Sequence, residues 1–195
     1  MANMYYEEHP DSKHDIHEIS VNLLGHTFHL MTDAGVFSKK MVDYGSQVLL
    51  KALAFQKGER LLDVGCGYGP LGIALAKVEE LDVTMVDINH RAVDLAQKNA
   101  LNNQVKVQVF QSDLYDKVTG HFEHIISNPP IRAGKKVVHA IIEEAKDYLV
   151  SGGDLTIVIQ KKQGAPSAKA KMELVFGNCQ VLTKDKGYYI LRSVK

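Results

Sequence analysis

The chain has 195 residues, 45% hydrophobic and 24% charged, a balance typical of one folded domain with a sizeable core. Its 23 basic and 23 acidic side chains cancel, so any nucleic-acid surface must be a local patch. No apolar run is long enough for a membrane span and no signal peptide is evident, so we expect a cytoplasmic protein without a membrane partner. Cys66 and Cys179 are expected to be reduced thiols. The histidines have no cysteine or carboxylate cluster at zinc-ligand spacing, so we expect no metal.

The first 55 residues predict an extension packed on a main domain that covers residues 56–195. Its polar start is typical of a loose terminus, and the β-biased runs on either side of Gly25 predict a hairpin. In chain order the extension comprises a tail (1–15), a hairpin (17–32), a loop (33–40) and a helix (41–55).

From residue 60 onward, short apolar runs alternate with segments of helical periodicity. This alternation predicts βαβ units, an α/β fold and a parallel sheet covered by helices on both faces. A tight turn separates the last two strands, which predicts an antiparallel edge. The predicted strands are 60–65, 81–87, 105–110, 122–127, 153–160, 178–183 and 187–194, and the predicted helices are 70–78, 89–103, 135–150 and 165–174.

The first βα turn, "DVGCGYG" at 63–69, indicates a ligand site. Its glycines let a ligand approach the backbone closely, and the helix that follows presents free N–H groups. The dinucleotide fingerprint would need a glycine where Pro70 stands, and a phosphate-binding Gly-Lys-Ser/Thr is absent. The turn therefore favours a ligand other than a dinucleotide or a nucleoside triphosphate.

Three acids lie at or beyond the ends of consecutive predicted strands: Asp63, Asp87 and Asp113. A carboxylate at Asp63 suits a ligand with an ammonium group and a sulfonium cation. Asp87 lies where an acid can accept hydrogen bonds from both hydroxyls of a ribose. Asp113, or the backbone beside it, can reach an exocyclic amine of adenine. Each acid alone could instead be a helix cap or a turn residue.

The motifs "DVGCGYG", Asp87, "SDL" (112–114) and "SNPP" (127–130) resemble, in order and spacing, the S-adenosylmethionine (AdoMet) core of the class I methyltransferases. The resemblance covers about residues 35–195. It implies AdoMet as methyl donor and a Rossmann-like seven-stranded, mostly parallel sheet with one antiparallel strand in the edge region. The candidate cofactor-binding residues are Asp63, Gly65, Cys66, Gly67, Asp87, Ile88, Ser112, Asp113, Leu114 and Asn128.

In that family, Asn-Pro-Pro marks enzymes that methylate a planar, conjugated nitrogen. The resemblance implies that the Asn128 side-chain oxygen and the Pro129 carbonyl accept the amine N–H bonds and aim its lone pair at the methyl group. Pro129 and Pro130 have restricted φ angles and donate no competing N–H. The catalytic candidates are therefore Asn128, Pro129 and Pro130. The alternative is a strand that simply ends in a Pro-Pro turn.

The segment "DAGVFSKKMVDYGSQVLL" resembles the one ahead of the glycine loop in RsmC-type enzymes, which modify guanine N2 of 16S ribosomal RNA (rRNA). Standalone bacterial proteins with "NPPIRAGK", described as RsmC-like, resemble this chain throughout. The resemblance implies rRNA or a small-subunit assembly intermediate as partner. However, only the catalytic half of RsmC is matched, and Ile131 replaces the usual aromatic residue. Adenine N6, a protein glutamine amide, or a non-catalytic AdoMet- or RNA-binding module remain alternatives, and a monomer or a homodimer is left open.

Substrate contacts are expected from two apolar residues, Phe37 and Ile131, and from a set of basic residues. Phe37 is a candidate stacking surface in place of the missing aromatic residue, or else a core residue. If the fold is as predicted, the basic residues form a rim that holds RNA phosphates, although each run could be solvated surface. The substrate-binding candidates are Phe37, Lys39, Lys40, Ile131, Arg132, Lys135 and Lys136, and Lys161 and Lys162 extend the rim.

Overall fold

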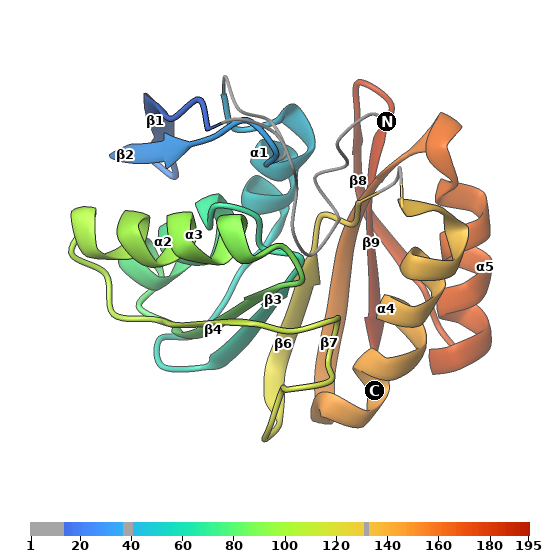
Figure 1. The fold of residues 1–195 in the computed structure, drawn as a ribbon. Helices are drawn as coiled ribbons and strands as arrows, with labels where there is room; N and C mark the ends of the chain where they lie inside the picture. The colour runs from blue at the N-terminus through green and yellow to red at the C-terminus, as the bar shows by residue number, and fades with distance from the viewer. Residues whose placement is uncertain (1–13, 37–40, 131–132) are drawn as a thin grey trace.

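The chain folds into a seven-stranded sheet with helices on both faces and a two-stranded hairpin beside it, in a computed structural model that describes residues 14–36, 41–130 and 133–195 (Figure 1). The main sheet consists of β3 (Arg60–Val64), β4 (Asp82–Asp87), β5 (Gln108–Gln111), β6 (Phe122–Ser127), β7 (Leu149–Gln160), β8 (Gln180–Asp185) and β9 (Tyr188–Val194). The hairpin consists of β1 (His17–Leu23) and β2 (His26–Thr32). The predicted Rossmann-like α/β fold is confirmed.

The strand order β5-β4-β3-β6-β7-β9-β8 places the ligand crevice. From β3 the chain moves outward through β4 and β5, then returns to add β6 and β7 on the other side of β3. Crossovers that leave in opposite directions open a crevice at the carboxyl ends of β3 and β6. Only β9 runs against the other strands, since it pairs antiparallel with both β7 and β8, as predicted.

Two apolar cores lie on the two faces of the sheet. Alternate residues of β3 point to opposite faces, so Leu61 joins one core and Leu62 the other. Because both faces are covered, β3, β4 and β6 carry buried apolar side chains on both faces rather than on one face alone. The first core lies under α1 (Tyr44–Ala52), α2 (Pro70–Val78) and α3 (His90–Asn102), and the second under α4 (Lys135–Tyr148) and α5 (Ala165–Phe176).

Several element boundaries differ from the predictions; for example, the helix expected over 41–55 covers only Tyr44–Ala52. The helix expected over 135–150 ends at Tyr148, because Leu149 and the residues after it already belong to β7. The strand expected from residue 105 begins only at Gln108. At the end of α3, Gln104 has a φ of 56° and the Val105 N–H donates to the Ala100 carbonyl at 2.9 Å. This Schellman-type closure keeps the residues after the helix out of the sheet.

The hairpin is held on the main domain by two asparagine side chains, Asn99 in α3 and Asn103 directly after it. The Asn99 amide accepts from the Met31 N–H at 2.7 Å and donates to the Met31 carbonyl at 2.9 Å. Asn103 makes the same pair of bonds to His29, at 3.1 and 2.7 Å. These side chains satisfy the outer edge of β2 as a neighbouring strand would. The division of the chain at residue 55 stays a prediction.

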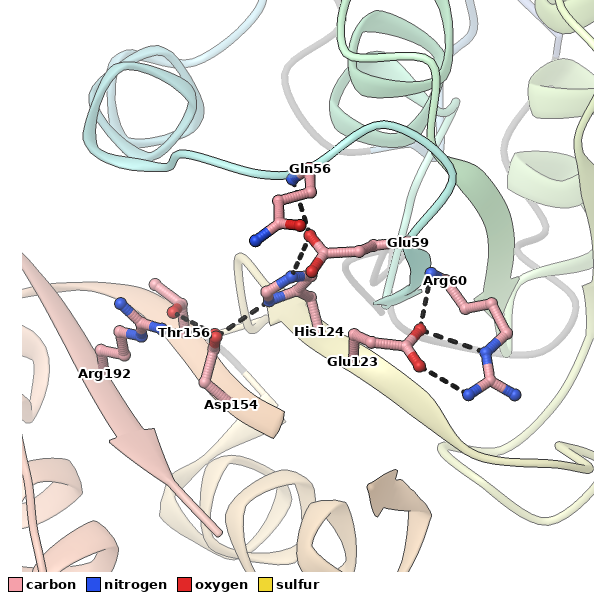
Figure 2. A network of polar contacts seen from close by, with 8 residues as sticks. All are labelled: Gln56, Glu59, Arg60, Glu123, His124, Asp154, Thr156 and Arg192. Atoms are coloured by element: carbon pink, nitrogen blue, oxygen red, sulfur yellow. Dashed lines mark hydrogen bonds and ion pairs between the residues drawn. The ribbon is translucent and has the colours of Figure 1, made fainter. Parts of the chain in front are cut away.

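A polar network surrounds His124 in the amino-terminal half of β6, away from the crevice at the carboxyl ends of the strands. Figure 2 shows its residues. The His124 Nδ1 atom is 2.9 Å from an Asp154 oxygen, and its Nε2 atom is 2.9 Å from a Glu59 oxygen. Asp154 also accepts from Arg192 at 2.8 Å and from Thr156 at 3.2 Å. The imidazole therefore joins β6 to β7 and to the turn before β3.

Over the three described ranges, no helix is both long and apolar enough to cross a bilayer. Within the same ranges, no three His, Cys, Asp or Glu side chains come together as metal ligands would.

Candidate functional site

A cavity of about 330 Å³ opens at the carboxyl ends of β3, β4 and β6, where the strand order reverses. Its size and position are those of a small-molecule site in a doubly wound sheet. Its wall includes every cofactor candidate of the sequence analysis except Asp63, and every catalytic candidate. These residues are Gly65, Cys66, Gly67, Asp87, Ile88, Ser112, Asp113, Leu114, Asn128, Pro129 and Pro130.

The glycine loop presents open backbone to this cavity. Gly65 and Gly67 have φ angles of 74° and 58°, in the left-handed region that favours glycine. A Cβ atom on Gly67 would meet nothing within 4 Å, and one on Gly65 would meet only Pro130 Cδ, at 4.0 Å. The loop is tied to β4, since the Gly67 N–H donates to Asp87 at 2.8 Å. A ligand can therefore lie directly against the loop backbone.

Asp87 connects the glycine loop to the start of α3. One oxygen accepts from the Gly67 N–H, and the other accepts from the Asn89 N–H at 2.9 Å. Burial raises the pKa of Asp87 to about 6, while these backbone hydrogen bonds lower it. The carboxylate is ionised at neutral pH, and each oxygen keeps a further lone pair for a ligand hydroxyl.

Asp63 lies beneath the loop and does not reach the cavity wall. The residue is fully buried, and one oxygen accepts from the Gly72 N–H at 3.2 Å. Its other oxygen, Oδ1, has no hydrogen-bond partner among the described residues. Burial raises the pKa of Asp63 to about 7, against the lowering effect of the Gly72 bond.

The Asn-Pro-Pro turn closes the cavity at the end of β6. The Ser127 hydroxyl donates to the Val64 carbonyl at 2.7 Å, which fixes this end of β6 against β3. The Pro130 carbonyl accepts from the Ala133 N–H at 2.8 Å. Between these two anchors, the Asn128 side chain lies in the cavity wall.

Sequence reasoning missed three polar residues of the cavity wall. Asp43 and Ser46, at the start of α1, both accept hydrogen bonds from the Asn128 amide. Their only sequence signal was a spacing typical of a helix cap. Tyr68 is buried, and its hydroxyl has no partner in the part of the chain that the structure describes. Burial raises the pKa of Tyr68, and likewise that of the Cys66 thiol, which is therefore a poor nucleophile.

The substrate-binding candidates are only partly placed. Lys135 and Lys136 are exposed at the first turn of α4, outside the cavity wall. Lys161 and Lys162 are exposed in the short 3₁₀ helix η2 (Lys161–Gln163), directly after β7. Five candidates lie outside the described residues, namely Phe37, Lys39, Lys40, Ile131 and Arg132.

Comparison with known proteins gives the family. The profile described as "Methyltransferase small domain" matches residues 27–192. The chain belongs to the methyltransferase small domain family. The YbxB protein of Bacillus subtilis (strain 168) is 46% identical to this family member over 200 residues, an alignment that covers both chains completely. The predicted resemblance to class I, RsmC-like methyltransferases is confirmed.

Two relatives of this methyltransferase small domain protein have names that state an activity. Ribosomal RNA small subunit methyltransferase C of Erwinia tasmaniensis is 31% identical, over all of this chain and 53% of that protein. The solved structure "T. Thermophilus 16S rRNA N2 G1207 methyltransferase (RsmC) in complex with AdoMet and Guanosine" is 30% identical, with a TM-score of 0.85 over 92% of this chain and 50% of that one. The chain thus spans about half the length of these two relatives.

Proposed function

We propose that the cavity binds AdoMet and that the protein methylates an exocyclic amino nitrogen of rRNA, most simply guanine N2 of the small-subunit RNA. The observation that carries this proposal is that the glycine loop, Asp87 and the Asn-Pro-Pro turn all contribute to the wall of one cavity. The names of these two relatives support an RNA substrate, and one of the two was solved in complex with AdoMet and guanosine.

The cavity residues fit AdoMet on their own chemistry. The open backbone at Gly65 and Gly67 leaves room for the methionine part of the cofactor. Asp87 keeps acceptor capacity for a pair of ribose hydroxyls, and Asp113 is exposed at the rim, within reach of the adenine end. When bound, AdoMet supplies an electrophilic methyl group on a sulfonium.

The protein's own contribution to methyl transfer is alignment and charge stabilisation. An exocyclic amine has its lone pair spread into the base, so it is a poor nucleophile. If the Asn128 oxygen and the Pro129 carbonyl each accept one N–H, the nitrogen is turned so that its lone pair faces the methyl group. The same two acceptors stabilise the positive charge that grows on the nitrogen. The amine becomes acidic only during transfer, so no strong base is needed beforehand.

The proposal is tested by incubating the purified protein with tritiated AdoMet and rRNA from cells that lack it. We expect label in the RNA, recovered as N2-methylguanosine after nucleoside analysis, and a transfer rate lower by at least about 100-fold with the Asn128→Ala variant. That variant should bind AdoMet almost as tightly as wild type, because Asn128 acts on the substrate amine. Label in methyladenosine, or in protein, would overturn the choice of guanine N2. Absence of any transfer to rRNA or to whole small subunits would overturn the proposed activity.

A further inference from the structure

The Asn128 amide is held by two residues that lie more than eighty positions earlier in the chain. Its Nδ2 atom donates to Asp43 Oδ2 at 3.0 Å and to Ser46 Oγ at 2.9 Å. The Ser46 hydroxyl in turn donates to the same Asp43 oxygen at 2.5 Å. Ser46 is buried, and both residues belong to the start of α1. The extension therefore reaches into the wall of the transferase cavity.

Both partners of the Asn128 nitrogen can only accept there. A carboxylate has no donor, and the single proton of the Ser46 hydroxyl is committed to Asp43. If the Asn128 amide were flipped, its oxygen would face the Asp43 carboxylate, and two acceptors would be opposed without a proton between them. The hydrogen-bond network thus fixes the orientation of the amide. With both N–H bonds used, the amide presents its oxygen to the remaining space.

We propose that Asp43 is a positioning residue of the methyl-transfer site, acting through Ser46 and Asn128. This inference rests on the proposed function and names the residue that makes Asn128 an acceptor for the substrate amine. Asp43 keeps the amide oxygen, rather than its NH2 group, toward the amine. Its negative charge also polarises the amide and strengthens that oxygen as an acceptor. A flipped amide would oppose its NH2 group to the N–H bonds of the substrate.

The competing explanation is that Asp43 only caps α1. Its Oδ1 does accept from the Ser46 N–H at 3.2 Å, as an N-cap side chain should. The substitution Asp43→Asn separates the two roles, because asparagine caps helices about as well as aspartate. With its oxygen kept on the Ser46 N–H, an asparagine at this position turns its NH2 group, and no longer an acceptor, toward Asn128. The variant therefore keeps the cap and removes the enforced orientation.

The kinetic test compares wild type, Asp43→Asn, Asn128→Ala and the double variant. For Asp43→Asn we expect kcat to fall by about 10- to 100-fold, the loss for one charge-assisted hydrogen bond, with AdoMet affinity within about twofold of wild type. The double variant should be no slower than Asn128→Ala, since Asp43 acts through Asn128. Asp147→Asn makes the same change of charge at an exposed site near the end of α4 and should leave kcat unchanged. An unchanged kcat in Asp43→Asn, or losses that multiply in the double variant, would overturn the inference.

A second measurement does not depend on activity. The side-chain amide resonances of Asn128 can be assigned in ¹⁵N-edited NMR spectra by their absence in Asn128→Ala. We expect these two protons to exchange slowly in wild type, and to shift and exchange faster in Asp43→Asn, while the melting temperature stays within a few degrees. If wild type transfers no methyl group but this response is seen, the proposed function fails and the orienting contact stands. If the amide resonances do not respond to Asp43→Asn, the positioning role is wrong whatever the activity.

Discussion

Replacement of His124 by glutamine should weaken the fold in a way that depends on pH. Each ring nitrogen of His124 faces a carboxylate oxygen at 2.9 Å, one from Asp154 and one from Glu59 (Figure 2). A neutral imidazole has one N–H and could donate to only one of these acceptors, so the geometry favours the charged ring. Burial alone lowers the pKa of His124, but the two carboxylates outweigh it and raise the pKa above its usual value.

The loss of unfolding free energy depends on which partners Asp154 and Glu59 keep after the substitution. Breaking a buried ion pair by removing one partner costs about 3–5 kcal/mol of unfolding free energy. Asp154 still has Arg192 at 2.8 Å, and the Glu59 side chain is 25% exposed, so we expect the lower end, about 3 kcal/mol at pH 6. For a chain of 195 residues this corresponds to a melting temperature lower by roughly 6–12 °C.

The effect should shrink as pH rises. The folded protein binds the His124 proton more tightly than the unfolded chain does, so this stabilisation is complete below the unfolded pKa of about 6.5 and is lost as pH rises through the higher folded pKa. Urea unfolding of wild type and His124→Gln at pH 6 and pH 9 measures the difference in unfolding free energy, which should be smaller at pH 9. His26→Gln, at an exposed position of the hairpin, is the control. A difference that stays constant or grows with pH would refute the charged imidazole.

Three further predictions concern the cavity, the basic rim and the core. Asp87→Ala should weaken AdoMet binding at least tenfold by calorimetry, since it removes the proposed ribose acceptor and the anchor of the glycine loop. An unchanged affinity would show that the ribose does not bind at Asp87. The double variant Lys135→Ala, Lys136→Ala should bind RNA more weakly. The slope of the logarithm of its binding constant against the logarithm of salt concentration should be smaller by about 1.4. A slope equal to that of wild type would show that neither lysine contacts the RNA. Gly72→Ala should destabilise the protein by about 1–3 kcal/mol, because its methyl group would overlap the Met85 side chain; helix propensity alone predicts a gain in the unfolding free energy.

Much of the architecture and the cofactor side of the site could be predicted from local sequence. Parallel strands buried on both faces are short apolar runs, and the residues directly after them must lie at one edge of the sheet. Asp87 and the Asn-Pro-Pro turn could therefore be assigned to the same site as the glycine loop, and the structure places them in one cavity wall. Asp63 follows the same pattern, but its side chain points under the loop to Gly72, a direction that strand position alone does not decide.

Contacts between distant segments were decided only by the tertiary structure. His124 meets Glu59 and Asp154 because β6 lies between β3 and β7, and that neighbourhood depends on the strand order. Asp43 looks like a helix cap in the sequence, and only the packing of α1 brings it to Asn128. The sequence by itself determined where the strands, helices and turns lie and which residues stand at the strand ends, because backbone periodicity and turn chemistry are local. Which side chain orients another was determined by the fold, because hydrogen bonds act over about 3 Å in space without regard to separation along the chain.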